Sequence, residues 1–139
     1  LLAGRGGAAF FLDYGFPEAE YYHPQRHMGT VMCHHLHEAD DNPLDKVGLK
    51  DVTAHVNFTG VALAAQNAGL QVLGYTCQAH FLFNLGLAQR MEASSLAQRT
   101  QAARLVNEHE MGELFKVIGL ATTEWAAQGF AHGDRTHRL

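Results

Sequence analysis

The sequence predicts an α/β fold, because short apolar runs of strand length alternate along the chain with segments of helical pattern. The clearest strand is "AAFFLD" at residues 8–13, an apolar run that ends in an acid and a glycine turn. The 139 residues fit one compact unit and are too few for two ordinary domains. A run as apolar as residues 8–13 needs neighbours on both sides, yet only three principal strands are found, so the sheet lacks partners.

The first elements follow from local signals. "LLAGRGG" at residues 1–7 is typical of a helix end that runs into a turn. Asp13 is expected at the carboxyl end of the first strand. Residues 16–28 contain two prolines and no period, which predicts a loop rich in Tyr and His that could bind a ligand. Residues 29–37 should be extended, and residues 38–45 form an acidic, solvated turn.

The second part of the chain alternates helices and strands. Asn57 is a suitable N-cap for a helix that Gly69 ends in the left-handed region. A strand at 70–76, a helix at 78–91, a helix capped by Ser94 or Ser95 and a strand at 113–122 follow. We therefore expect residues 1–122 to form the folded body and residues 123–139 a flexible tail.

Composition limits the function. The net charge of -4 and a pI near 6.2 offer no basic face, which argues against nucleic acid as a partner. No apolar run approaches the roughly 18 residues of a membrane span, so no membrane partner is expected. Two distant cysteines without a preceding leader fit a reducing compartment, and the expected location is the cytoplasm.

The histidine-rich segment "GTVMCHHLH" at 29–37 suggests a metal site at first sight. In an extended chain Cys33, His35 and His37 share a face, but alternate side chains stand roughly 6–7 Å apart, so binding one ion would require a bend. We predict no metal site. A non-catalytic metal-binding or protein-interaction module that uses these histidines is retained as the alternative function.

Six strings in one order resemble the MidA family of S-adenosylmethionine-dependent methyltransferases, whose mitochondrial member is a complex I assembly factor that acts on a protein arginine. They are "LDYG" at 12–15, "YYHP" at 21–24, "GTVMCHHLH" at 29–37, "DVTAHVNF" at 51–58, "GYTCQAHFLFNLG" at 74–86 and "EMGELFKVIGL" at 110–120.

The resemblance implies the carboxyl-terminal part of a class I, Rossmann-like methyltransferase fold. The chain would supply strands five to seven with their intervening helices, the last two strands forming an antiparallel pair. S-adenosylmethionine would be the cofactor and a protein the substrate. The glycine-rich cofactor turn would precede the chain, so cofactor-binding residues here are unknown, and this piece alone should neither bind the cofactor well nor catalyse.

The resemblance and the predicted strand ends together nominate the site residues. The catalytic candidates are Asp13, Tyr14 and His55. The substrate-binding candidates are Tyr21, Tyr22, His34, His37 and Asp51. Structural roles are weighed beside these: Asp13 could satisfy loop amides, Asp51 could cap the helix entry, and His55 could be a half-buried polar group.

The chain departs from the family pattern at two places. It has His35-Leu36 where the family often has Tyr-Arg, and Asn57 where the family has Asp. The second change preserves N-capping chemistry, whereas the first leaves the substrate open. The unpaired edge of residues 8–13 is expected to drive association, so a homo-oligomer is possible.

Overall fold

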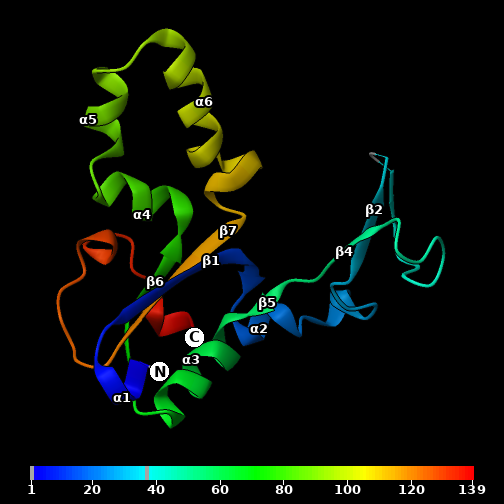
Figure 1. The fold of residues 1–139 in the computed structure, drawn as a ribbon, viewed down its shortest axis with the longest axis horizontal. Coiled ribbons are helices and arrows are strands. Elements are labelled where there is room, and N and C mark those ends of the chain that lie inside the picture. Colours follow the sequence, from blue (N-terminus) through cyan, green and yellow to red (C-terminus); the bar gives the residue numbers. More distant parts are fainter. Residues whose placement is uncertain (1, 37) are drawn as a thin grey trace.

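The computed structural model describes residues 2–36 and 38–139 of the chain. A short helix α1 (Leu2–Arg5) leads into a four-stranded mixed sheet with the order β5-β1-β7-β6 (Figure 1). Its strands are β1 (Ala8–Phe16), β5 (Val56–Asn57), β6 (Gln71–Cys77) and β7 (Phe115–Ala121). β7 lies between β1 and β6 and runs antiparallel to both, which confirms the predicted α/β fold and the predicted antiparallel pair.

The strand β1 has the open edge that the sequence predicts from the missing neighbours of residues 8–13. Phe11 is 52% exposed and Leu12 is 46% exposed. One edge of β1 pairs with β7 along its length, but the other edge pairs with β5 only at Gly15 and Phe16. β1 also continues three residues beyond Asp13, so this acid does not mark the end of the strand.

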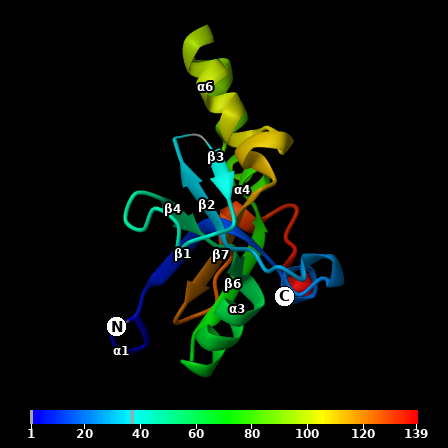
Figure 2. The ribbon, with the colours of Figure 1, turned by 90° about the vertical axis from the view of Figure 1, so that its right-hand side faces the viewer.

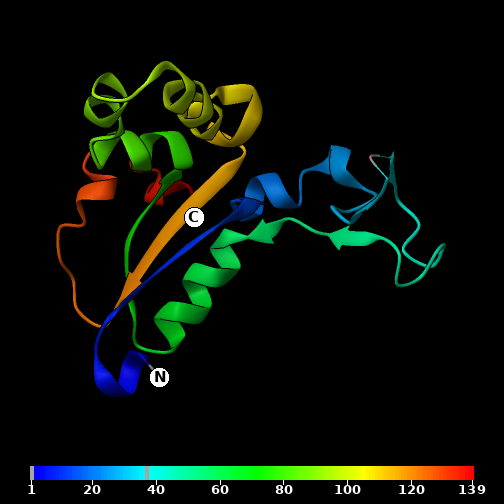
Figure 3. The same cartoon turned by 45° about the horizontal axis from the view of Figure 1, so that its top comes forward.

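Helix α3 (Phe58–Asn67) covers one face of the sheet and confirms the predicted start and stop signals (Figure 3). The Asn57 side chain accepts a hydrogen bond from the Gly60 N–H at 3.1 Å, and Gly69 adopts φ +78° just beyond the helix. Phe58 packs in a core cluster with Tyr75 and other residues of β6 and β7. This cluster fixes α3 against the sheet.

The region 78–107 forms three helices, α4 (Gln78–Asn84), α5 (Leu87–Glu92) and α6 (Leu96–Val106). The predicted single helix at 78–91 is broken because Gly86 adopts φ +86° between α4 and α5. Of the two predicted caps, Ser94 and Ser95, it is Ser95 that begins α6, and it forms a capping box with Gln98. A short helical turn, η2 (Glu108–Gly112), then leads into β7.

Residues 16–53 differ most from the prediction. The expected loop contains two helical turns, α2 (Glu18–Tyr21), which follows Pro17, and η1 (Pro24–Arg26), which begins with a proline. A second, antiparallel sheet with the order β3-β2-β4 follows, formed by β2 (Met32–His35), β3 (Glu38–Asp40) and β4 (Asp51–Thr53). The expected turn at 38–45 therefore begins as a strand. In Figure 1 this small sheet projects from the body, and in Figure 2 it faces the viewer.

The carboxyl-terminal segment carries η3 (Gln128–Phe130), which packs on the face of the sheet opposite α3, and η4 (Thr136–Arg138), which lies beside α2 and α3. Phe130 is 7% exposed and packs with Val117 of β7 and Phe81 of α4. A side chain at Gly74 or Gly119 would collide with the Phe130 ring. Phe130 belongs to residues 123–139, which the sequence predicts to be a flexible tail, yet it packs on the folded body. The mobility of the end of this segment stays a prediction.

Candidate functional site

A hollow of about 660 Å³ opens where the carboxyl end of β1 meets the small sheet. We call it the β1–arm hollow. Its walls are contributed by β1, η1 and the turn after it, β2, β4 with the residues that follow it, and Leu114 just before β7. They bring together four residues singled out in the sequence. These are Tyr14, His34, Asp51 and His55.

The rings of Tyr14 and His55 line the β1–arm hollow, and the rings of Phe115 and Phe16 pack behind them. His55 lies on Phe16 with ring centroids 4.9 Å apart and an interplanar angle of 28°. Tyr14 meets His55 edge-on at 6.3 Å and contacts Phe115 with centroids 4.0 Å apart. The Arg26 guanidinium carbon lies 3.9 Å from the centre of the Phe16 ring, a cation–π contact at the rim.

His55 is held by its backbone and carries an unpaired ring nitrogen. The backbone N–H of His55 donates a hydrogen bond to the Thr30 hydroxyl at 3.2 Å, which connects the residues before β5 to those before β2. Its Nδ1 is buried and has no hydrogen-bond partner among the described residues. An unpaired buried polar atom costs about 1–3 kcal/mol, so a bound molecule or a shift of the ring that supplied a partner would recover free energy.

His34 and Asp51 face each other across the β2–β4 pair and are both exposed. The suggestion that Asp51 caps the helix is wrong, because Asp51 belongs to β4 and Asn57 caps α3. His37, another predicted substrate residue, lies outside the described residues. Across the ranges 2–36 and 38–139 no group of three His, Cys, Asp or Glu side chains could hold a metal ion.

The remaining predicted residues lie away from the β1–arm hollow. Side chains alternate along a strand, so Asp13 points to the face opposite Tyr14. There it borders a largely apolar hollow of about 580 Å³ between β1 and α3, and its Oδ1 accepts a hydrogen bond from the Tyr14 N–H at 2.8 Å. Tyr21 and Tyr22 pack edge-to-face with each other at 5.0 Å, and neither lines the β1–arm hollow. Their functional roles stay predictions.

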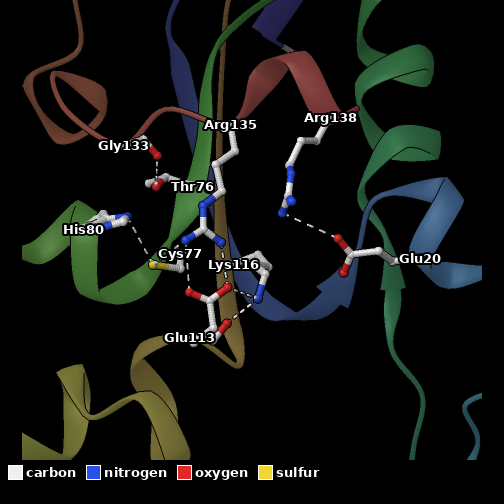
Figure 4. Close-up of polar contacts among 9 residues, drawn as sticks. All are labelled: Glu20, Thr76, Cys77, His80, Glu113, Lys116, Gly133, Arg135 and Arg138. Carbon is white, nitrogen blue, oxygen red and sulfur yellow. Dashed lines mark hydrogen bonds and ion pairs between the residues drawn. The ribbon is translucent and has the colours of Figure 1, made fainter.

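A polar cluster that sequence reasoning missed joins the carboxyl-terminal segment to the sheet (Figure 4). Arg135 binds Glu113 through two hydrogen bonds, of 2.6 and 3.1 Å, and Lys116 lies 3.4 Å from the same carboxylate. Burial alone would raise the pKa of Glu113, but the hydrogen bonds from Arg135 and the charge of Lys116 lower it to about 2. No local sequence signal connects residues that stand 22 positions apart.

Cys77 and His80 border this polar cluster, with the sulfur and the His80 Nδ1 3.5 Å apart (Figure 4). Burial raises the pKa of the Cys77 thiol, and the nearby Glu113 carboxylate acts in the same direction. A thiolate is the reactive form of cysteine, so a buried neutral thiol is inert as a nucleophile. The contacts of the cluster anchor the carboxyl-terminal segment to the sheet.

A dinucleotide-like cofactor is usually held where a glycine turn joins a strand to a helix. In the described part of the chain, β5 passes into α3 and β6 into α4 without an intervening glycine. The glycines at positions 4, 6 and 7 precede β1. Gly15 lies inside β1, where a Cβ atom would press 2.7 Å from the Phe58 ring. These residues do not form a cofactor cradle, and we assign none of them a cofactor contact.

No helix in the described residues is long and apolar enough to cross a bilayer. A search of curated proteins found no match. Two solved structures from Burkholderia thailandensis are each 45% identical to this chain. One, a native structure of an uncharacterized superfamily protein, has a TM-score of 0.92 and is matched over 97% of this chain and 38% of its own.

The second structure is described as a "likely methyl transferase" bound to S-adenosyl-homocysteine. It has a TM-score of 0.87 and is matched over 96% of this chain and 36% of its own, so the chain spans less than two fifths of either solved protein. The model of a family described as "Putative S-adenosyl-L-methionine-dependent methyltransferase" matches residues 2–76, more than half of the chain. The chain therefore belongs to this family of S-adenosyl-L-methionine-dependent methyltransferases.

Proposed function

We propose that the protein is a class I methyltransferase of the MidA kind that methylates an arginine side chain of a protein, and that this chain forms the acceptor side of its cleft. The observation that carries the proposal is the β1–arm hollow, which gathers Tyr14, His34, Asp51 and His55 at the carboxyl end of β1. Ligands of open α/β sheets bind at that end of the strands. The 45% identical solved protein that binds S-adenosyl-homocysteine supports the cofactor.

In this proposal the cofactor supplies an activated methyl group, and the residues of this chain prepare the acceptor. A guanidinium must lose a proton before its nitrogen has a lone pair free to attack. The Asp51 carboxylate can accept two parallel hydrogen bonds from a guanidinium and orient it. The unpaired Nδ1 of His55 can take the proton if the ring turns toward the acceptor.

The aromatic wall has the right chemistry for such an acceptor. Arg26, which lines the hollow, already places its guanidinium on the face of the neighbouring Phe16, so a planar cation pairs with an aromatic ring at this edge. Tyr14 and His55 continue the same wall inward. A substrate arginine would therefore pass from an aromatic rim to the Asp51 carboxylate. Positioning of this kind supplies much of the rate of a transfer that needs an in-line approach.

The test is S-adenosyl-homocysteine formation by the protein in its full natural length, with arginine-containing peptides as acceptors. We expect His55→Ala to lower kcat about 100-fold, the lower range for loss of a general base. Asp51→Asn should mainly raise KM for the peptide. Glu92→Gln on α5, remote from the hollow, is the matched control. Unchanged kinetics in both hollow variants would refute the assignment of this site.

The two cysteines support a cytoplasmic location as part of the same proposal. Cys33 and Cys77 are both buried as free thiols and form no disulfide with each other. Proteins in reducing compartments keep such thiols. Localisation of a fluorescently tagged protein tests this, and accumulation outside the cytoplasm would contradict it.

A further inference from the structure

The small sheet and its loops, residues 28–53 without residue 37, form a projecting arm that is unusually apolar on its surface (Figure 1). We call it the arm. Five of its apolar side chains are between 69% and 83% exposed: Met28, Leu36, Leu44, Val47 and Leu49. Soluble proteins rarely gather so many large apolar side chains on one exposed element unless it meets a partner.

The arm is also acidic. Residues 28–53 contain five acidic side chains and two lysines, a net charge of -3 with histidines neutral, whereas the whole chain carries -4. Lys50 is neutralised within the arm, since its ammonium lies 2.6 Å from Asp40 and 3.5 Å from Asp45 and its side chain is 3% exposed. Glu38 and Asp41 are exposed and form no ion pair with any described residue. They leave a negative potential on the surface.

The arm has a defined shape that can present these groups. The buried Lys50 holds Asp40 of β3 and the carbonyl of Asn42 at 3.1 Å, so the loop after β3 is tied to the start of β4. His35 Nδ1 and the Leu49 carbonyl lie 2.8 Å apart, which joins β2 to the same loop. A surface fixed in this way loses less entropy on binding than a flexible loop would.

The arm is continuous with the β1–arm hollow. His34 of β2 and Asp51 of β4 form part of the wall of the hollow, and the same strands continue outward to the exposed acidic and apolar groups. A polypeptide lying along the arm would therefore reach the hollow with one of its side chains. This continuity distinguishes the arm from the exposed helices α5 and α6, which lie at the far end of the molecule (Figure 1).

We infer that the arm is the docking surface for the protein acceptor, and that it recognises a segment in which basic residues alternate with apolar ones; this rests on the proposed function. Charge selects this partner. A second copy of the chain would bring the same acidic arm, and a nucleic acid or an anionic lipid surface would be repelled. A basic, apolar polypeptide satisfies both the exposed carboxylates and the exposed side chains.

The probe is a fluorescein-labelled 12-residue peptide of alternating arginine and leucine, titrated with the protein in its full natural length and followed by anisotropy. Glu38→Lys with Asp41→Lys should raise Kd at least tenfold and weaken its salt dependence. This variant keeps the Asp40–Lys50 pair, and its melting curve checks folding. Glu92→Lys with Glu124→Lys makes the same charge change away from the arm, and its Kd should stay within twofold.

A second variant removes apolar contacts without changing charge. Leu44→Ser with Val47→Ser should raise Kd at least fivefold, because both side chains are exposed and their replacement leaves the sheet intact. The inference is overturned if the arm variants bind like the controls. It is also overturned if a glutamate–leucine peptide binds as tightly as the arginine–leucine peptide, or if light scattering shows that the arm holds a second copy.

Methyl transfer to the same peptide separates this inference from the function on which it rests. If the peptide binds through the arm but is never methylated, docking stands and arginine methylation fails. If the wild type and the arm variants methylate the peptide with the same KM, methyl transfer stands and arm docking is wrong. A rise in KM for the arm variants with unchanged kcat supports both, because docking acts on binding and not on the transfer step.

Discussion

Replacing Phe130 by alanine should destabilise the protein, although this residue lies in the segment that the sequence suggests is a tail. Its ring is stacked against Phe10 with centroids 6.3 Å apart and contacts Phe81 at 5.3 Å. Phe130 is 7% exposed, close to the limit of full burial. Buried Phe→Ala changes cost about 3–5 kcal/mol. Because the site lies near the surface and can partly collapse, we expect about 3 kcal/mol.

Urea denaturation followed by circular dichroism measures this loss. With a denaturant dependence of about 2 kcal/mol per molar urea, the unfolding midpoint should fall by about 1.5 M. Phe83→Ala is the matched control, because Phe83 is 45% exposed on α4, and it should shift stability by no more than about 0.5 kcal/mol. If Phe130→Ala unfolds at the wild-type midpoint, the packing of the carboxyl-terminal segment does not contribute to stability in solution.

Three further predictions follow from single features. The pKa of Glu113 falls from 4.5 to about 2 on folding, so the stabilisation from its carboxylate is complete above pH 4.5 and lost as the pH falls from 4.5 to 2. This difference in pKa corresponds to about 3.4 kcal/mol, which solvent screening at a 38% exposed side chain reduces to roughly 1–2 kcal/mol. Arg135→Met should reduce this pH dependence of the free energy of unfolding, which urea titrations at several pH values measure. Asn57→Ala should cost about 1 kcal/mol in thermal unfolding while Asn57→Asp costs little, and equal losses would contradict the capping role. The 139-residue chain should self-associate through the open edge of β1, and Leu12→Lys should reduce this self-association. Light scattering that finds a monodisperse monomer at high concentration would rule the self-association out.

The parts of the fold that sequence reasoning placed correctly are those determined by neighbouring residues. The Asn57 cap, the Gly69 stop and the Ser95 capping box each depend on groups within a few positions, so the pattern contains the whole cause. The break at Gly86 was also local, but a glycine in a helical pattern does not reveal whether its φ is positive. The sequence therefore predicts one helix from 78 to 91, whereas the structure has two, α4 and α5.

The features that the sequence could not supply depend on residues far apart in the chain. The Glu113–Arg135 ion pair and the packing of Phe130 connect β7 and the residues just before it to the carboxyl-terminal segment. That segment has no hydrophobic period from which these contacts could be predicted. The small sheet was missed because β3 has three residues, two of them acidic, and its strand character comes from pairing with β2. The open edge of β1 was predictable, because its apolar run needs more neighbours than the strands of this chain provide.

The candidate site shows the same division. The sequence identified Tyr14, His34, Asp51 and His55 individually, but their convergence depends on the short parallel contact between β1 and β5 and on the return of β4 to β2. Alternation along β1 separates Asp13 from Tyr14, so adjacent candidates lie in different hollows. The β1–arm hollow combines apolar walls with the side chains of His34, Asp51 and His55, whereas the hollow beside α3 is almost entirely apolar. The two hollows thus lie on opposite faces of one strand, and a substitution in one hollow should leave the other hollow unchanged.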